Sequence, residues 1–169
     1  MMAQARPTFA LRPYLPADLP LLAEIFCASI EELTGDDYSA EQQEAWASTV
    51  DDEEAFGERL ASSLTIVATL NGSPVGFASL EEPDHLDLLY VHPTVAGQGV
   101  GTMLVDALEK LAAARGASKL TADVSDTALE FFGRRGFKPQ RRNTVERGGE
   151  WLTNTTMEKK LAASGSAQQ

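Results

Sequence analysis

The 169-residue chain is long enough for one domain with a single core, and its 43% apolar and 23% charged content is ordinary for a globular protein. No apolar run reaches the roughly 20 residues of a membrane-spanning helix. Residues 1–7 lack the apolar region of a secretory signal, so we expect a cytoplasmic protein. The formal net charge of −11 disfavours nucleic acid and anionic membranes as partners and suits a cationic substrate.

The first half of the chain is expected to be mainly helical. Alternating side chains predict a strand at 8–12, and apolar spacing predicts a helix ending near Leu33, with Asp18 as its N-cap. Ser39 and Gln42 resemble a capping box that opens a second helix. A third helix should follow from 51 to about 60.

The second half changes to the two-residue period of strands. It predicts strands at 64–70, 74–80, 85–91 and 119–124, a helix at 99–114, a short helix at 126–135, and a last hairpin at 138–145 and 151–157. The fold class is α/β of the α+β type. One mixed, mostly antiparallel sheet of about seven strands should carry helices on both faces, with one parallel step across the long helix. We expect one domain over 8–161, with flexible ends at 1–7 and 162–169.

Three alternate glycines mark the start of the long helix. Gly97, Gly99 and Gly101 lie in LYVHPTVAGQGVGTMLVDALEKL, residues 89–111. The dinucleotide fingerprint Gly-x-Gly-x-x-Gly fails, because its third position from Gly97 falls on Thr102, and no Gly-Lys-Ser/Thr triplet of a P-loop is present. Converging peptide N–H groups at a helix N-terminus would suit a diphosphate. A tight strand-to-helix turn is the alternative.

The segment LYVHPTVAGQGVGTMLV resembles the acetyl-CoA loop of the GNAT superfamily of N-acetyltransferases. In that pattern a hydrophobic-Val-x-Pro strand end precedes Arg/Gln-x-x-Gly-x-Gly/Ala at a helix start. Further segments are similar to the family in order from about 8 to 161: TFALRPYLPADLPLLAEIF, VGFASL, ALEFFGRRGF and NTTMEKKL. The resemblance implies the GNAT-like acyl-CoA N-acyltransferase fold and an enzyme that uses acetyl-CoA as co-substrate, without a metal.

The resemblance also assigns the coenzyme site. The backbone at Leu89, Tyr90 and Val91 should bind the pantetheine arm like an added strand, where two neighbouring parallel strands separate. Asp126 and Phe132 belong to the expected coenzyme-binding set. The pyrophosphate should be held by the loop residues Ala96, Gly97, Gln98, Gly99, Val100, Gly101 and Thr102.

Two positions depart from the family pattern. Ala96 stands where an Arg or Gln side chain would order the loop, and Gln98 is a partial substitute. Phe132 stands where much of the family has a tyrosine near the thioester sulfur as general acid. Phe132 has no proton to donate, so Tyr90, Tyr38 and Cys27 are open alternatives, and a thiolate with a pKa near 8.5 can leave without an acid.

Acetyl transfer requires a neutral amine, and an alkyl ammonium with a pKa of about 10.4 is deprotonated at pH 7 in only roughly one molecule in a few thousand. Family members often carry the base four or six residues before the Val of the Val-x-Pro signature, which gives Asp87 and His85. We expect His85 as base or water relay and Asp87 as its partner or as a ligand of the amine. Alternation places both on one strand face, opposite Tyr90. A solvated bend is the alternative; zinc at His85, Asp87 and His92 lacks the usual spacing.

The acceptor site of the family lies beside the first helices, where this chain is rich in carboxylates. We expect Glu31, Tyr38 and Trp46 to bind a cationic amine, small or peptidic. A solvated acidic surface is the alternative. Cys27, in an apolar helix, is a poor nucleophile for a covalent intermediate, so direct transfer in a ternary complex is expected. A catalytically weakened acyl-CoA-binding regulator is the second hypothesis. A homodimer is also open.

Overall fold

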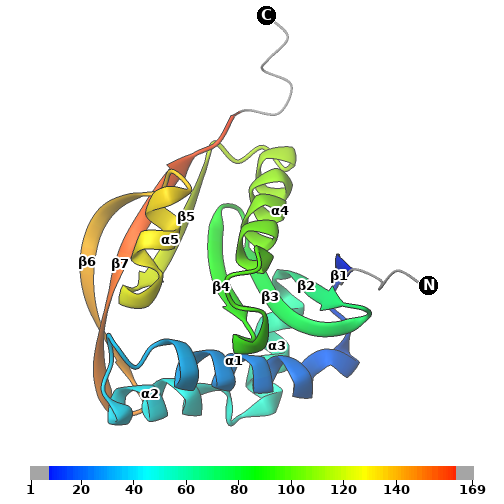
Figure 1. Ribbon diagram of the computed structural model, residues 1–169. Helices are drawn as coiled ribbons and strands as arrows, with labels where there is room; N and C mark the ends of the chain where they lie inside the picture. Colours follow the sequence, from blue (N-terminus) through cyan, green and yellow to red (C-terminus); the bar gives the residue numbers. More distant parts are fainter. Residues whose placement is uncertain (1–7, 163–169) are drawn as a thin grey trace, which may run out of the picture.

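In the computed structural model, residues 8–162 form one seven-stranded sheet flanked by helices (Figure 1). The flexible ends expected at 1–7 and 162–169 lie outside the described residues, apart from position 162. The helices are α1 (Leu19–Leu33), α2 (Ala40–Ala47), α3 (Glu53–Ser62), α4 (Val100–Ala114) and α5 (Leu129–Arg134). The strands are β1 (Phe9–Pro13), β2 (Leu64–Leu70), β3 (Ser73–Glu81), β4 (His85–Val91), β5 (Lys119–Ser125), β6 (Lys138–Arg147) and β7 (Glu150–Lys160).

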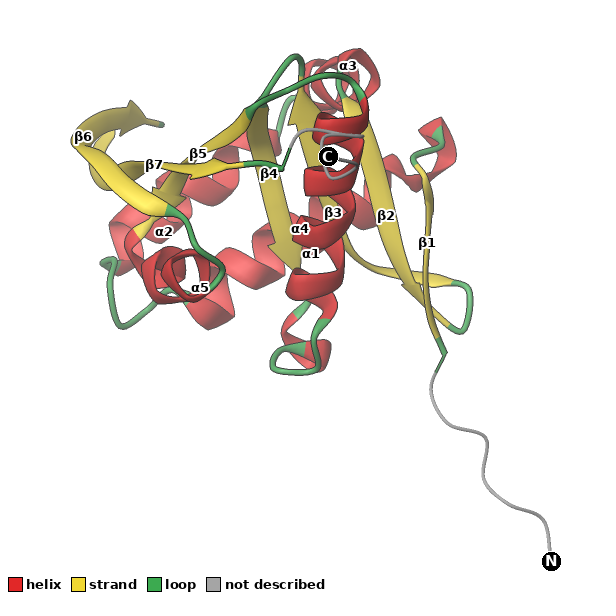
Figure 2. Ribbon diagram, turned by 90° about the horizontal axis from the view of Figure 1, so that it is seen from above, coloured by secondary structure: helices red, strands yellow, loops and turns green. Residues whose placement is uncertain are grey.

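The strands follow the order β1-β2-β3-β4-β5-β7-β6. All neighbours pair antiparallel except β4 and β5, which are parallel and are joined by α4. This parallel step divides the sheet into a four-stranded part and a three-stranded part, which Figure 2 shows from above. The predicted mixed, mostly antiparallel sheet of seven strands is confirmed.

Helices cover both faces of the sheet, because successive strand residues point to opposite sides. Ala68 and Ala78 pack with Leu104 and Leu108 of α4 in one apolar core. Their chain neighbours Val67 and Phe77 face the other way, into a second core with α1 and α3.

Local sequence signals account for several element ends. The Ser39–Gln42 capping box is formed: the Gln42 N–H donates to Ser39 Oγ at 3.1 Å, and the Ser39 N–H donates to Gln42 Oε1 at 2.9 Å. Asp18 occupies the expected N-cap position of α1, but its side chain forms no capping hydrogen bond with that helix. Its carboxylate is buried, accepts from the Leu15 N–H at 2.8 Å and pairs with Arg12, so it fixes the turn before α1 to β1.

No helix of residues 8–162 has the length and apolar character needed to cross a bilayer.

Candidate active site

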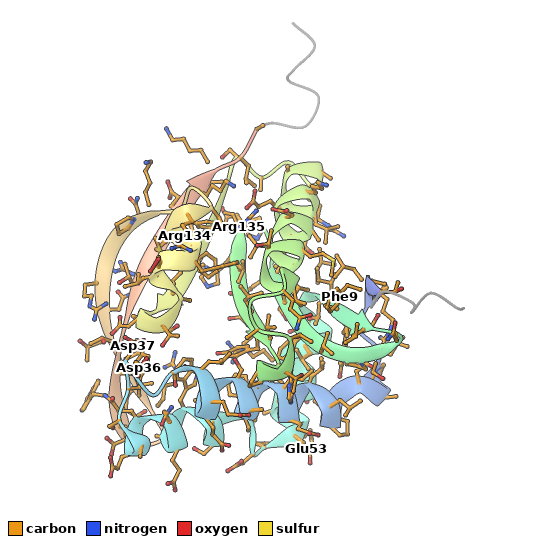
Figure 3. All side chains as sticks on the ribbon, viewed as in Figure 1. Phe9, Asp36, Asp37, Glu53, Arg134 and Arg135 are labelled. Carbon is orange, nitrogen blue, oxygen red and sulfur yellow. The ribbon has the colours of Figure 1, made fainter. Side chains whose placement is uncertain are left out.

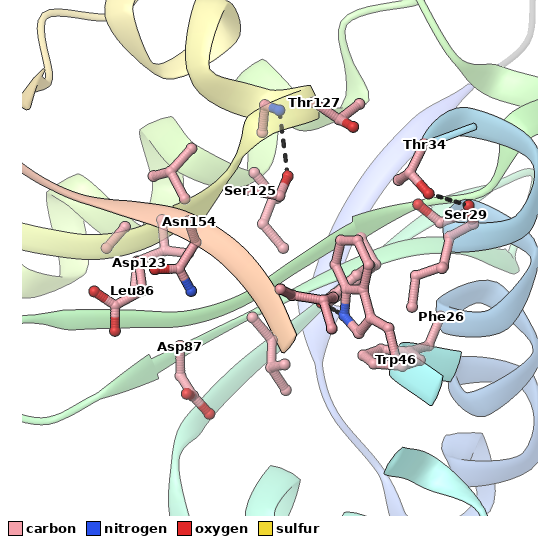
Figure 4. A pocket seen from close by; sticks show the side chains of 18 of the residues that line it. Phe26, Ser29, Thr34, Trp46, Leu86, Asp87, Asp123, Ser125, Thr127 and Asn154 are labelled. Carbon is pink, nitrogen blue, oxygen red and sulfur yellow. Dashed lines mark hydrogen bonds between the residues drawn. The ribbon is translucent and has the colours of Figure 1, made fainter. Parts of the chain in front are cut away.

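The site is a cavity of about 370 Å³ at the point where β4 and β5 separate. The two strands pair only at His85–Thr121 and Leu86–Ala122. Beyond these pairs the strand edges part, and the backbone of Leu89 to Val91 lines the cavity. Figure 4 shows Phe26 and Trp46 on one side of it, with Asp87, Asp123 and Asn154 on the other. An open strand edge can accept an extended ligand as an additional strand.

A bulge in β4 determines which side chains face which layer. The register with β3 shifts, so Ser79 pairs with Leu88 and Leu80 pairs with Leu86, leaving Asp87 as an extra residue. Leu86 therefore packs in the α4 core, whereas Leu88 packs in the α1–α3 core beside Tyr90. The expectation that Tyr90 faces away from Asp87 is wrong, because simple alternation does not hold across a bulge.

The loop before α4 has the conformation that its glycines permit. Gly97 and Gly99 have φ of +78° and +86°, and a Cβ added to either would meet no atom within 4 Å among the described residues. Their conformation, rather than crowding by the protein, calls for glycine. The N–H groups at the first turn of α4, from Gly99 to Thr102, have no partner within the helix and point out of its N-terminus. This is suitable geometry for an anion.

The two departures from the family pattern have visible consequences. Gln98 Nε2 donates to the Thr94 carbonyl at 3.4 Å, so this side chain bridges the loop that Ala96 cannot order. Phe132 is buried against Phe137 and Phe131 and lines the cavity, where it offers no proton. Gly101 lies directly against Phe131, whose ring would be 3.3 Å from an added Cβ.

His85 lines the cavity at its narrow end, where β4 and β5 still pair. Its Nδ1 lies 2.9 Å from Thr121 Oγ1, and that hydroxyl also donates to the Asp84 carbonyl at 3.4 Å. With the hydroxyl hydrogen directed at Asp84, the Thr121 oxygen accepts from an N–H at Nδ1. The lone pair of the neutral imidazole is then at Nε2.

Asp87 also lines the cavity, but its partner is Arg59 of α3. The guanidinium Nε and Nη2 donate to the two carboxylate oxygens at 2.7 and 2.9 Å. Within residues 8–162 the Asp87 carboxylate forms no hydrogen bond with His85, so Asp87 does not orient the imidazole. The bidentate pair holds a negative charge beside His85 and neutralises it in part.

Tyr90 lies among aromatic rings of the α1–α3 layer. It packs on Phe26 with ring centroids 4.4 Å apart, and its hydroxyl oxygen accepts from Trp46 Nε1 at 3.3 Å. Burial raises the pKa of Tyr90 to about 12. Because indole only donates, the hydroxyl hydrogen of Tyr90 is directed elsewhere and can serve a ligand.

Three of the expected site residues have other roles or lie elsewhere. The Tyr38 hydroxyl donates to the Thr153 carbonyl at 2.7 Å and accepts from the Asp126 N–H at 2.9 Å, so it joins three segments of the fold. Asp126 is outside the cavity lining, and its carboxylate binds Arg142 and Thr153. Glu31 is exposed and also outside the lining.

The remaining candidates are His92, Cys27 and a possible metal site. His92 is a turn residue, whose ring accepts from the Thr94 N–H at 3.1 Å. Cys27 lies outside the cavity lining, and burial raises the pKa of its thiol, with Glu31 adding to the effect. Glu81, His85 and Asp87 have ligand-type atoms within 4.8 Å of one another, but Asp87 is already bound to Arg59.

Sequence reasoning missed three charged residues of the cavity: Arg59, Asp123 and Arg147. Asp123 follows Ala122, the last residue of β5 that pairs with β4, and its only side-chain hydrogen bond within residues 8–162 is one accepted from Thr156 at 2.6 Å. Arg147 is at the end of β6. None of the three lies in a recognisable motif, so only the assembled sheet brings them to one cavity.

The carboxylates expected at the acceptor entrance lie outside it. Asp36, Asp37 and Glu53 are on the end formed by α1, α2 and α3, whereas Arg134 and Arg135 are on α5 at the other end (Figure 3). The acidic side chains from α1 to α3 are all exposed, and none lines the cavity: Glu24, Glu31, Glu32, Asp36, Asp37, Glu41, Glu44, Asp51, Asp52, Glu53, Glu54 and Glu58. They contribute a long-range negative field rather than contacts.

A mixed sheet with a cavity between two parting parallel strands, next to a glycine loop at a helix N-terminus, defines the class of acyl-CoA N-acyltransferase folds. Residues 34–161 match the family model of the acetyltransferase (GNAT) domain. The chain belongs to the GNAT family and is an N-acetyltransferase of that type.

Three relatives give the extent of the similarity. YafP of Escherichia coli K12, described as an uncharacterized N-acetyltransferase, is 38% identical over 147 residues, 87% of this chain and 93% of that protein. A crystal structure of a GCN5-related N-acetyltransferase from Rhodopseudomonas palustris is 62% identical with a TM-score of 0.89, covering 95% of this chain and 99% of that one. The PaiA N-acetyltransferase of Thermoplasma acidophilum, solved with coenzyme A, shares the fold at a TM-score of 0.74 and 21% identity, over 90% and 99% of the two chains.

Proposed function

We propose that the protein transfers the acetyl group of acetyl-CoA to a primary amine directly, in a ternary complex. The observation that carries the proposal is the reach of the cavity. It extends from Gly101 of α4, through the gap between β4 and β5, to Trp46 and Arg59 in the layer on the opposite face. Two substrates can therefore meet from opposite faces of one sheet. Cys27 offers no covalent route, because it lies outside the cavity and its thiol pKa is raised.

The residues present fit the coenzyme. The open space at Gly97 and Gly99 and the free N–H groups of the first turn of α4 suit a pyrophosphate, since amides and the helix dipole favour an anion without cationic side chains. The unpaired edge of β4 from Leu89 to Val91 suits the pantetheine amides. Acetyl-CoA supplies the activated thioester, and an acidic protein can thus bind a polyanionic donor.

We assign His85 as the base, acting through water. Its Nε2 carries the lone pair when Thr121 accepts from Nδ1, so the neutral imidazole can take a proton from a water molecule. Because His85 is four residues before Leu89, a span of roughly 13 Å along a strand, a water relay is required. Asp87 is bound to Arg59 and acts on the amine through its charge.

Tyr90 replaces the proton donor that Phe132 cannot supply. Tyr90 lines the cavity, and its hydroxyl accepts from Trp46 and has a hydrogen free for a ligand. With a pKa of about 12 it remains protonated at neutral pH, so it can donate a hydrogen bond to the departing thiolate. The backbone N–H groups at the parted edge of β4 are suited to stabilise the oxyanion of the attacked carbonyl.

We propose a positively charged ammonium as the form in which the acceptor arrives. The net charge of −11 favours its approach, and the Asp123 carboxylate in the cavity has only a threonine hydroxyl as partner. Trp46 and Phe26 provide an apolar wall for the rest of the molecule. The cytoplasmic location and the homodimer remain predictions.

The test is acetyl-CoA binding by calorimetry, followed by thiol release with a panel of amines. Binding together with turnover of at least one amine is expected. Binding without turnover of any amine would favour the regulator hypothesis, and absence of binding would contradict both. Pre-steady-state mixing without an amine should release no thiol, because direct transfer forms no acetyl-enzyme.

A further inference from the structure

We propose that the amine acceptor also carries an anionic group, a carboxylate in the simplest case, and that Arg147 binds it. This inference rests on the proposed function and narrows its substrate class to molecules that hold an amine and an anion together. The acceptor part of the cavity is the part beside Trp46 in the α1–α3 layer. Two arginines, Arg59 and Arg147, line the cavity.

The two arginines differ in their partners. Arg59 is matched by Asp87 through two hydrogen bonds of 2.7 and 2.9 Å. Arg147 donates to the carbonyl of its chain neighbour Glu146 at 2.9 Å, and it meets no carboxylate at ion-pair distance in the part of the chain that the structure describes. Its cross-strand neighbour Glu150 forms no ion pair with it, and Glu146 accepts instead from the Gly149 N–H at 2.7 Å. Arg147, an exposed residue at the edge of the cavity, therefore brings there a positive charge that has no carboxylate partner among residues 8–162.

The backbone that carries Arg147 is fixed against α2. Gly148 lies so close to that helix that an added Cβ would be 2.8 Å from the Ala45 carbonyl oxygen, which excludes any larger residue. Gln42 Nε2 donates to the Trp151 carbonyl at 2.8 Å on the other strand of the hairpin. The end of the β6–β7 hairpin is thus docked, and the guanidinium extends from a defined position.

Arg147 acts near the point of transfer. Arg147 and Tyr90 line the same cavity, and the positive charge of Arg147 opposes in part the rise in the Tyr90 pKa that burial causes. A planar guanidinium recognises a carboxylate through paired hydrogen bonds. The exposed helical carboxylates oppose an anion only at long range, where salt screens them over about 8 Å. An acceptor with both charges can pair its ammonium group with Asp123 and its anionic group with Arg147. A polyamine offers only positive charges, which Arg147 would repel.

The experiment compares acceptors that differ only in the anion. Standard α-amino acids, and the ω-amino acids from glycine to 6-aminohexanoate, are each assayed beside their carboxamides with saturating acetyl-CoA. For at least one pair, kcat/KM of the wild type should favour the acid by about ten-fold or more. The Arg147→Gln variant should reduce that preference to about one, and Arg147→Lys should retain part of it.

Arg141→Gln is the matched control, because Arg141 lies on the same strand, outside the cavity, with Asn143 as its partner. It should leave the preference unchanged, while calorimetry shows equal acetyl-CoA affinity in all variants. Turnover of simple alkyl amines or carboxamides at least as fast as the acids, or a preference that survives Arg147→Gln, would overturn the inference and leave the proposed function intact. Acetyl-CoA binding with no amine turned over would instead contradict the proposed function.

Discussion

The coenzyme end and the acceptor end of the cavity are built from different parts of the molecule. The proposed coenzyme end combines the backbone of Leu89 to Val91 and Gly101, which line the cavity, with the glycine loop before α4, which lies outside the cavity lining. The acceptor end consists of side chains from α1, α2, α3 and the β6–β7 hairpin, among them Trp46, Arg59 and Arg147. Changes at the first end should act on coenzyme affinity, and changes at the second should act on turnover or on the choice of amine.

The largest effect is expected at the coenzyme end. Gly99→Asp should lower acetyl-CoA affinity by about 100-fold or more, because a carboxylate would point into the space meant for the pyrophosphate. Gly99→Ala is the control: it carries the same strain at φ of +86°, roughly 1–2 kcal/mol, without the charge, so its loss should stay near ten-fold. Calorimetry measures both. Equal losses would show that strain alone matters and that no anion is bound there.

The contrast between the two ends also explains what the sequence could predict. Helix and strand periods, the capping box at Ser39 and the glycine spacing before α4 are local signals, and these elements formed as expected. The cavity location followed from the family resemblance. The positions of Tyr38 and Asp126 did not, since both residues join β7 to distant segments through hydrogen bonds that no local pattern encodes.

The bulge in β4 is the clearest case of a signal that the sequence lacks. Alternation across HLDLLYV assigns Asp87 and Tyr90 to opposite faces, but one extra residue reverses that assignment. Its position depends on the pairing with β3 and on the Arg59 of α3 that holds Asp87. Arg147 was missed for a similar reason, because its approach to the cavity depends on the docking of Gly148 on α2.

The second prediction concerns the base. His85→Gln should lower kcat by about 100-fold with little change in acetyl-CoA affinity, because a general base contributes on that scale. Thr121→Val removes the hydroxyl that fixes the tautomer and should give a smaller loss of kcat. The check is a series of initial rates with both variants and calorimetry of acetyl-CoA binding. Turnover unaltered by His85→Gln would refute the assignment.

The third prediction concerns Tyr90. Tyr90→Phe should lower kcat by roughly ten-fold, since the thiolate can also leave without an acid, and should leave acetyl-CoA affinity unchanged. A matched variant is Tyr14→Phe, whose ring lies outside the cavity lining and which should leave kcat unchanged. A kcat for Tyr90→Phe equal to that of the wild type would remove Tyr90 from the reaction.

Tyr90 also predicts a pH dependence of stability. Burial raises its pKa in the folded protein to about 12, above the ordinary value near 10, so folding favours the protonated phenol. This contribution is fully present below pH 10 and is lost as the pH rises from about 10 to 12. Denaturant unfolding at pH 9, 10 and 11 should therefore show a steeper fall for the wild type than for Tyr90→Phe. Parallel curves would mean that the Tyr90 hydroxyl is not buried in solution.

The smallest effect on activity is expected at Tyr38. We expect this residue of the acceptor end to have a structural role and no catalytic one. Its hydroxyl is engaged by the Thr153 carbonyl and the Asp126 N–H, so it has no proton to offer a substrate. Tyr38→Phe removes both bonds and should lower the free energy of unfolding by about 1–2 kcal/mol, with kcat within about two-fold of the wild type. Chemical denaturation and the amine assay measure the two quantities on one preparation. A loss of kcat comparable to that of Tyr90→Phe, with stability unchanged, would instead make Tyr38 the proton donor.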